Sequence, residues 1–256
     1  MIEKFKLTLP FAGGKNAKRN VYVYVPDSFE EDEEQRYPVL YMFDGHNVFY
    51  DEDATYGKSW GLGNYLDSTD TRIMVVAVEC SHAKKNGRLS EYSPFTFEDE
   101  TFGHIKGRGK LTMDWYAGEL KPYIDEHYPT IPDREATWIA GSSMGGLMAL
   151  YAVSCYNEVF GRAAALSPSV WTSPKNIERM LRDSHMGPDT VLYMDYGQRE
   201  FENHKGMRSL YTRFVSRLMK TGINLTSRVV PNGDHSEECW EQQLPFVIPT
   251  LLYERE

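Results

Sequence analysis

The sequence has no long hydrophobic run, few cysteines and no excess of positive charge. No apolar stretch reaches the roughly 18 residues that a membrane-spanning helix needs, which argues against a membrane protein. The 28 lysine and arginine residues are outnumbered by 37 aspartate and glutamate residues, giving a net charge of −9. Because nucleic acids and anionic membranes attract clustered positive charge, this balance argues against both as partners.

Cysteine is scarce: the chain holds three, Cys80, Cys155 and Cys239, and they are far apart. An odd number of widely spaced cysteines, without the spacing of a metal motif, predicts reduced thiols. The N-terminus alternates charged and apolar residues and lacks the hydrophobic core of a signal peptide. We therefore expect a cytoplasmic protein.

Residues 136–146 carry the most informative pattern, an apolar, β-favouring run that meets Gly-Ser-Ser-Met-Gly-Gly. A helix-forming stretch follows at once, so the order is strand, sharp turn, helix. A serine on such a turn lies at a helix N-terminus, where backbone N–H groups favour a developing negative charge. Gly141 and Gly145 lack the Cβ that would obstruct the turn. The pattern predicts a nucleophile elbow centred on Ser143, with Ser142 as the alternative and a simple small-residue turn as the non-catalytic interpretation.

Strand-like and helix-like segments alternate from residue 38 onward. Strands are predicted at 38–43, 73–78, 136–140, 162–166, 190–194 and 225–230, and helices at 60–66, 112–128, 147–153, 176–182, 207–218 and from 236. The helix at 112–128 is expected to bend at Pro122. Such alternation implies right-handed crossovers and a mostly parallel, doubly wound α/β sheet. The segments 5–9 and 20–25, with a turn at 13–16 between them, predict an antiparallel hairpin at its edge.

We expect residues 1–256 to form a single domain with a sizeable core, because no repeat or linker interrupts the chain. Periodicity is lost at about 81–111, a charged stretch that contains several aromatic residues. A loop this long in a compact domain is usually functional. Its aromatic side chains predict a wall over the active site.

A serine nucleophile needs a base, and the base needs a carboxylate that fixes its tautomer. On a parallel sheet such groups gather at the carboxyl ends of the strands, in the chain order serine, acid, histidine. His235 follows the last predicted strand in a glycine-containing loop and is predicted as the base, in preference to His185 and His204. Asp195 and Glu200 both follow the strand at 190–194, and either could be the acid.

An oxyanion hole needs two backbone donors. The N–H of Met144, which follows the nucleophile, is predicted as one of them. The loop at 44–47 after the third predicted strand is expected to supply the other, with Gly45 allowing close approach. A plain β-turn is the alternative interpretation of this Asp-Gly pair.

Together these residues resemble the "Putative esterase" family of α/β-hydrolases, which includes feruloyl esterases, acetyl-xylan-type esterases, S-formylglutathione hydrolases and enterobactin-type siderophore esterases. The resemblance covers nearly the whole chain. It is carried by Tyr-Met-Phe-Asp-Gly at 41–45, Arg-x-x-Glu-Tyr-Ser-Pro at 88–94, Glu-Leu-Lys-Pro-Tyr-Ile at 119–124, Ala-Gly-Ser-Ser-Met-Gly-Gly at 140–146, Ser-Pro-Ser-x-Trp at 167–171 and Gly-Asp-His at 233–235.

The resemblance implies an α/β-hydrolase fold with Ser143 as nucleophile and His235 as base. The acid of the family follows a glycine by three residues, as Glu200 follows Gly197, which favours Glu200 over Asp195. The family often has aspartate at this place. The oxyanion segment reads Phe-Asp-Gly-His rather than starting with histidine-glycine, which leaves the second donor between Gly45 and His46.

Four residues near the predicted site, Trp60, Arg88, Tyr92 and Trp171, are candidate walls of the substrate site. The alternative is that the two tryptophans belong to the core and that Arg88 pairs with Glu91.

The sequence thus predicts a serine carboxylesterase for small-molecule esters of small or aromatic acyl groups, acetyl- or feruloyl-type, including esters on carbohydrates. No metal or organic cofactor is implied. A basic pocket around Arg88, Lys106 and Arg108 would instead favour a siderophore trilactone or an S-formylglutathione-type thioester. The alternative to an enzyme is a non-catalytic binding protein with the same fold. Acyl transfer to an alcohol and a homo-oligomeric state are left open.

Overall fold

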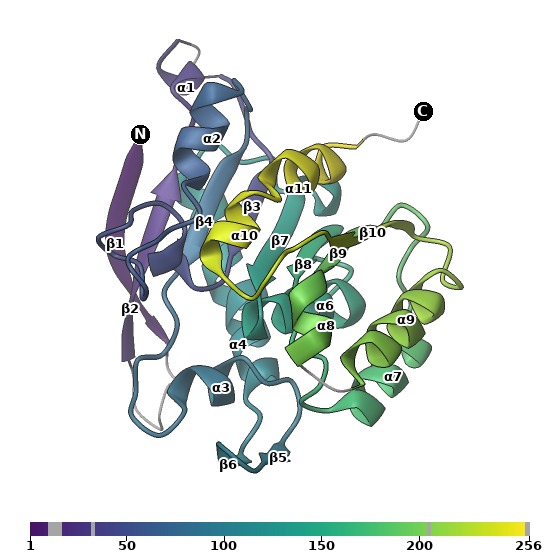
Figure 1. The fold of residues 1–256 in the computed structure, drawn as a ribbon. Coiled ribbons are helices and arrows are strands. Elements are labelled where there is room, and N and C mark those ends of the chain that lie inside the picture. Colours follow the sequence, from purple (N-terminus) through teal and green to yellow (C-terminus); the bar gives the residue numbers. More distant parts are fainter. Residues whose placement is uncertain (10–16, 32–33, 204–205, 254–256) are drawn as a thin grey trace.

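A computed structural model describes residues 1–9, 17–31, 34–203 and 206–253. An eight-stranded sheet runs through it in the order β1-β2-β4-β3-β7-β8-β9-β10 (Figure 1). Its strands are β1 (Ile2–Leu9), β2 (Ala17–Tyr24), β3 (Val39–Met42), β4 (Met74–Val78), β7 (Thr137–Ser142), β8 (Arg162–Leu166), β9 (Val191–Gly197) and β10 (Asn224–Val230). From β4 to β10 neighbouring strands are parallel, whereas β1–β2 and β2–β4 are antiparallel. The predicted mostly parallel sheet with an antiparallel N-terminal edge is confirmed.

Helices cover both faces of the sheet. One face packs against α2 (Leu62–Ser68), α10 (Glu237–Glu241) and α11 (Leu244–Leu251). The other packs against α4 (Gly109–Trp115), a π-helical turn η3 (Tyr116–Leu120), α5 (Lys121–His127), α6 (Met144–Cys155), α7 (Pro174–Asp183) and α9 (Met207–Leu218). Short helical pieces are α1 (Ser28–Glu31), η2 (Gly45–Asn47), α3 (Gly87–Glu91), η4 (Arg134–Ala136) and α8 (Gln198–Asn203). Among the described residues, no helix combines the length and the apolar character needed to cross a lipid bilayer.

The strand β3 shows why the sheet sequences are almost continuously apolar. Leu40 and Met42 point into the core beneath α2, α10 and α11, whereas Tyr41 points into the core on the opposite face. Because both faces are covered by helices, the side chains on both faces are mainly apolar.

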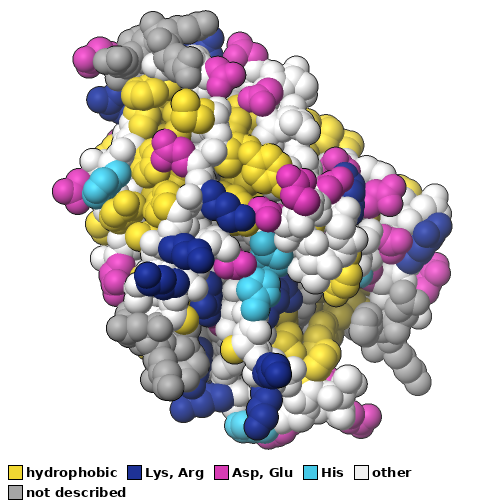
Figure 2. All heavy atoms as spheres, turned by 90° about the vertical axis from the view of Figure 1, so that its left-hand side faces the viewer, with side chains coloured by type: hydrophobic (Ala, Val, Ile, Leu, Met, Phe, Trp, Pro, Cys, Tyr) yellow, Lys and Arg dark blue, Asp and Glu magenta, His cyan; other side chains and the backbone are white. Residues whose placement is uncertain are grey.

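The antiparallel edge strand β1 has charged side chains that discourage pairing with another sheet. Lys4 pairs with Asp53 at 2.9 Å, and its ammonium lies over the ring of Tyr22. Figure 2 shows basic, acidic and hydrophobic side chains interspersed over this side of the molecule. The turn predicted at 13–16 lies outside the described residues.

Three predictions from the sequence are corrected. The stretch at 81–111 is not an irregular loop, because it contains α3 and a small hairpin of β5 (Phe97–Asp99) and β6 (Gly103–Ile105). The helix predicted at 112–128 is interrupted by the π-helical turn η3, which ends just before Pro122, a residue with no N–H to continue the ladder. The strand predicted at 190–194 continues to Gly197 and is followed by the unpredicted helix α8.

Candidate active site

Ser143 stands alone between β7 and α6, with φ 58° and ψ −119°. A residue with a side chain at positive φ is strained by about 1–3 kcal/mol, so the surrounding structure must hold it there. Backbone hydrogen bonds at both the N–H and the carbonyl of Ser143 hold it in this conformation. Its N–H donates to the carbonyl of Leu166 at 2.9 Å, and its carbonyl accepts from the N–H of Ser169 at 2.9 Å.

The glycines of this turn allow strand and helix to approach each other. A Cβ on Gly141 would lie 2.8 Å from the carbonyl carbon of Gly145, and one on Gly146 would lie 2.6 Å from the carbonyl oxygen of Leu166. Any larger residue at these positions would push α6 away from the sheet. The local geometry is the sharp strand–turn–helix connection that the sequence predicts around Ser143.

His235 meets a carboxylate at the end of the sheet. Its Nδ1 lies 2.7 Å from Oε2 of Glu200, which is buried in the first turn of α8. The other oxygen, Oε1, accepts from the hydroxyl of Ser167 at 2.6 Å and from the N–H of Gly197 at 2.8 Å. Both carboxylate oxygens are therefore fixed, and the side chain of His235 is half-exposed.

A close approach of two backbone segments brings these two residues together. A Cβ on Gly197 would lie 2.4 Å from the carbonyl oxygen of Gly233, in the loop that carries His235. Trp240 of α10 then packs edge-on against the imidazole of His235, with ring centroids 5.0 Å apart. Its indole N–H donates to Ser167 at 3.1 Å, the serine that also binds Glu200.

The alternative acid, Asp195, lies inside β9 and makes different contacts. It accepts hydrogen bonds from the hydroxyl of Tyr193 at 2.8 Å and from the N–H of Ser167 at 3.2 Å. Burial raises the pKa of the Asp195 carboxyl to about 7, despite these hydrogen bonds. Of the two candidates, the structure brings Glu200 and not Asp195 into hydrogen-bonding contact with His235.

Ser143 and His235 line the same cleft, whose volume is about 640 Å³. Its other walls come from the loop that contains η2, from the segments after β4 and β10, and from residues 55–58. Acidic Asp44, Glu237 and Glu238 face it together with basic Lys58 and Arg88. The cleft is thus close to neutral. Neither Lys106 nor Arg108 lines it, so the basic pocket considered from the sequence is not formed there.

Arg88, a candidate wall of the substrate site, lines the cleft and pairs with Asp44. Its Nε and Nη2 donate to Oδ1 and Oδ2 of Asp44, both at 2.7 Å. Burial by itself would raise the pKa of Asp44, but the attraction and hydrogen bonds of Arg88 outweigh it and lower that pKa below its usual value. Glu91 pairs instead with Arg19 of β2 at 2.9 Å, so the alternative interpretation, an Arg88–Glu91 pair, is wrong.

The aromatic residues proposed as substrate walls lie elsewhere. Trp60 is buried and packs beside Trp240, with ring centroids 6.2 Å apart. Tyr92 is buried against Phe43, and Trp171 packs edge-on against Phe97 of β5. None of the three lines the cleft. Their aromatic character serves packing, which is the alternative that the sequence left open for the tryptophans.

The two predicted oxyanion segments border the cleft. Met144 is the first residue of α6, so its N–H is among those that a helix leaves without an intrahelical acceptor. Asp44, in the left-handed conformation with φ 55°, leads into η2. A Cβ on Gly45 would lie 2.5 Å from the carbonyl carbon of Ala77 in β4, so this glycine is needed for packing onto the sheet.

Sequence reasoning missed several residues of the site. Ser169 places its hydroxyl 3.4 Å from that of Ser143, and Ser167 and Trp240 support Glu200. The Ser-Pro-Ser run at 167–169 could have indicated Ser167 and Ser169. It follows β8 directly and therefore lies at the carboxyl ends of the parallel strands, where Ser143 and His235 also lie. Of the rejected histidines, His185 is exposed after α7 and His204 lies outside the described residues.

Comparisons with known proteins identify the family and the fold of the chain. The model of the family described as "Putative esterase" matches residues 14–251. Over 189 residues the chain is 22% identical to the uncharacterized protein YbbA of Bacillus subtilis (strain 168), covering 73% of this chain and 70% of YbbA. A solved ferulic acid esterase superposes with a TM-score of 0.68 at 20% identity, covering 98% of this chain and 97% of that one.

A second solved structure, the siderophore hydrolase EstA from Aspergillus nidulans, superposes with a TM-score of 0.74 at 17% identity, covering 99% of this chain and 95% of EstA. At these identities the two structures establish the α/β-hydrolase fold. The family match extends over nearly the whole sequence and includes every residue of the site described above. The chain belongs to the Putative esterase family.

Proposed function

We propose that this chain is a serine carboxylesterase in which Ser143, His235 and Glu200 form the catalytic triad. The observation that carries the proposal is the 2.7 Å contact between His235 Nδ1 and Glu200 Oε2, in the same cleft as a serine held at φ 58°. A hydroxyl becomes a competent nucleophile when a histidine takes its proton, and a buried carboxylate fixes the tautomer that can do so.

In the proposed reaction, Oγ of Ser143 attacks the ester carbonyl carbon while Nε2 of His235 takes the hydroxyl proton. Glu200 accepts the hydrogen bond from Nδ1–H and stabilises the imidazolium. The oxyanion of the tetrahedral intermediate is held by the N–H of Met144 and by a second N–H from Gly45 or His46. His235 then protonates the leaving alcohol, and water attacks the acyl-enzyme by the same steps in reverse.

The proposed substrates are small-molecule esters with a small or aromatic acyl group. A cleft of about 640 Å³ is within the usual range for small-molecule sites. Its aromatic lining residues are Tyr56 and Trp240, and its charges nearly balance, so no excess of positive charge selects a strongly anionic substrate. The structural neighbours include a ferulic acid esterase, which supports an aromatic acyl group.

Initial rates on p-nitrophenyl acetate, butyrate and octanoate and on methyl ferulate test this proposal. We expect wild type to turn over the short or aromatic esters and Ser143→Ala to lose at least about 10³-fold in kcat/KM. Ser142→Ala is the matched control, since it removes a neighbouring hydroxyl and should retain the rate. Equal activity of wild type and Ser143→Ala would contradict the proposal, as would failure of a fluorophosphonate to label Ser143.

A further inference from the structure

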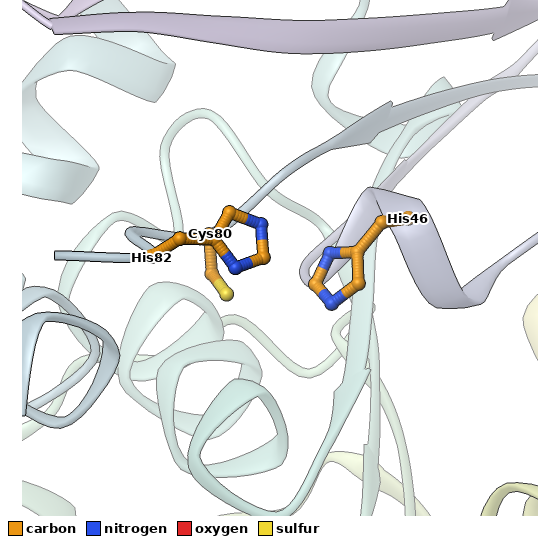
Figure 3. Close-up of side chains that lie close together, drawn as sticks. All are labelled: His46, Cys80 and His82. Carbon is orange, nitrogen blue, oxygen red and sulfur yellow. The ribbon is translucent and has the colours of Figure 1, made fainter. Parts of the chain in front are cut away.

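Three side chains that the proposed reaction does not use as acids, bases or nucleophiles gather on the wall of the cleft. Figure 3 shows His46, Cys80 and His82 pointing toward one another. His46 belongs to η2, and the other two follow β4. One ligand atom from each, an imidazole nitrogen or the thiol sulfur, lies within 4.8 Å of the other two. The two imidazole rings meet edge-on, with centroids 5.0 Å apart.

Each histidine already uses its Nε2 in a contact outside the group. Nε2 of His46 lies 2.9 Å from the hydroxyl of Thr55, and Nε2 of His82 lies 3.0 Å from Oε1 of Glu79. This leaves Nδ1 of both rings as the atoms available within the group. Histidines that bind metals are arranged in this way, with the second nitrogen held by a carboxylate or another polar group.

The Nδ1 atom of His46 gives the strongest indication that a ligand binds here. His46 is 95% buried, since its relative exposure is 5%. Its Nδ1 has no hydrogen-bond partner among the residues that the structure describes. A buried polar atom without a partner costs about 1–3 kcal/mol, which a bound ligand would offset. The other two ligand groups of the cluster are the thiol of Cys80 and the imidazole of His82.

We propose that His46, Cys80 and His82 bind a divalent transition-metal ion of the zinc class at the wall of the cleft. One sulfur and two nitrogen ligands suit borderline-soft ions of this class rather than Mg²⁺ or Ca²⁺, which prefer oxygen. Three protein ligands leave the fourth position of a tetrahedral ion for water or for an oxygen of a bound molecule.

The geometry requires a small adjustment for metal binding. Ligand atoms around a tetrahedral zinc ion are about 3.5 Å apart, given bonds of about 2.0–2.3 Å. Since the three atoms here lie within 4.8 Å of one another, they need to close by at most about 1.3 Å. His82, whose side chain is 59% exposed, is the ligand with freedom to move. All three residues line the same cleft as Ser143, so an ion could reach them from solvent.

The first experiment is a Zn²⁺ titration of the full chain, stripped with a chelator beforehand, by calorimetry and by competition with a chromophoric chelator. We expect one Zn²⁺ per chain. His82→Gln and Cys80→Ser should each weaken binding by at least about 100-fold, and Glu79→Gln by about 10–100-fold. His104→Gln and Cys155→Ser are the matched controls, because they remove an exposed histidine and an exposed cysteine outside the cleft.

Substitution with Co²⁺ provides a second readout that does not depend on affinity. We expect a thiolate-to-cobalt charge-transfer absorption that is present in the Cys155→Ser control and absent in Cys80→Ser. Because His82 is exposed, His82→Gln tests the site even where Cys80→Ser fails to fold. Absence of Zn²⁺ binding tighter than millimolar, or stoichiometric binding unchanged by His82→Gln, would overturn the proposal. Neither readout uses ester hydrolysis, so failure here is distinct from failure of the proposed function.

Discussion

Asp44 and Arg88, 44 residues apart in the chain, form a two-pronged ion pair with both N–O distances at 2.7 Å. The pair joins the start of η2 to α3 and forms part of the cleft wall. Asp44 is buried, and its backbone N–H also donates to the hydroxyl of Tyr92 at 3.2 Å. The arginine is therefore used to compensate a buried carboxylate and offers little net charge to a substrate.

This pair makes Arg88→Met a strongly destabilising substitution. Removing the guanidinium leaves the buried Asp44 carboxylate without compensation, which typically costs about 3–5 kcal/mol in free energy of unfolding. Urea denaturation of the purified variant measures the loss. Asp44→Asn combined with Arg88→Met should recover part of it, because the charge left behind is removed.

Lys58→Met is the matched control for that measurement. Lys58 pairs with Glu241 at 2.7 Å, but both side chains are more than a third exposed. We expect a change in unfolding free energy below about 1 kcal/mol. Equal losses for Lys58→Met and Arg88→Met would show that the Asp44–Arg88 pair has no special role in stability.

The two carboxylates near His235 should differ in their effect on activity. Glu200→Gln keeps the shape of the side chain but presents an amide to the imidazole, which disturbs its tautomer, so we expect kcat/KM to fall by about 10³–10⁴-fold. Asp195→Asn should retain kcat/KM within about tenfold, since Asp195 binds Tyr193 and Ser167 instead. Rates on the best ester from the substrate panel provide the comparison, and a larger loss in Asp195→Asn would reverse the assignment of the acid.

Asp195 should also govern the pH dependence of stability. Burial raises its pKa from 3.8 to about 7 in the folded protein. Between these values the folded state binds more protons than the unfolded state, so stability falls as the pH rises from about 4 to about 7. The loss attributable to this group is up to about 4 kcal/mol, complete above the folded-state pKa. Urea denaturation at several pH values measures it.

Asp195→Asn provides the test of that cause. An asparagine amide can accept from the N–H of Ser167 and donate to the hydroxyl of Tyr193, so the buried contacts are kept without a titrating group. We expect the variant to be more stable than wild type at pH 8 and to show a flatter profile between pH 4 and 7. A profile unchanged from wild type would assign the pH dependence to other groups.

Residues adjacent in sequence predict the elbow, whereas the preference for Glu200 over Asp195 came only from the resemblance to the family. Ser143 needs only a strand, two glycines and a helix, all adjacent in sequence. The choice between Asp195 and Glu200 depends on where β9 ends, and pairing of Gly197 with Val230 of β10 extends it beyond the apolar run. Asp195 therefore lies within the buried sheet, whereas Glu200 lies in the first turn of α8 and contacts His235.

The partner of Arg88 could not be inferred for a similar reason. Glu91 lies three residues away, at a spacing that favours pairing on a helix. It pairs instead with Arg19, 72 residues away on β2, because both are buried in the same place. The prediction that Trp60 and Tyr92 line the cleft is wrong for the same reason. The sequence shows that these side chains are large and aromatic, but not whether they face the cleft or the core.

The strained backbone of Ser143 leads to a prediction in which activity and stability move in opposite directions. At φ 58° and ψ −119° a glycine is unstrained, whereas any residue with a Cβ is not. Relief of about 1–3 kcal/mol is offset by the greater backbone entropy that glycine loses on folding, about 0.5–1 kcal/mol. We therefore expect Ser143→Gly to raise the free energy of unfolding by about 1 kcal/mol and to abolish ester hydrolysis.

Ser143→Ala is the matched variant, since it removes the same hydroxyl but keeps the Cβ and therefore the strain. It should be equally inactive, with an unfolding free energy close to that of wild type. Chemical denaturation of the three proteins under one set of conditions separates the two contributions. If Ser143→Gly and Ser143→Ala were equally stable, the strain at this positive φ would be no larger than the backbone entropy that glycine loses on folding, about 0.5–1 kcal/mol. The fold would then hold Ser143 in this conformation at little cost in stability.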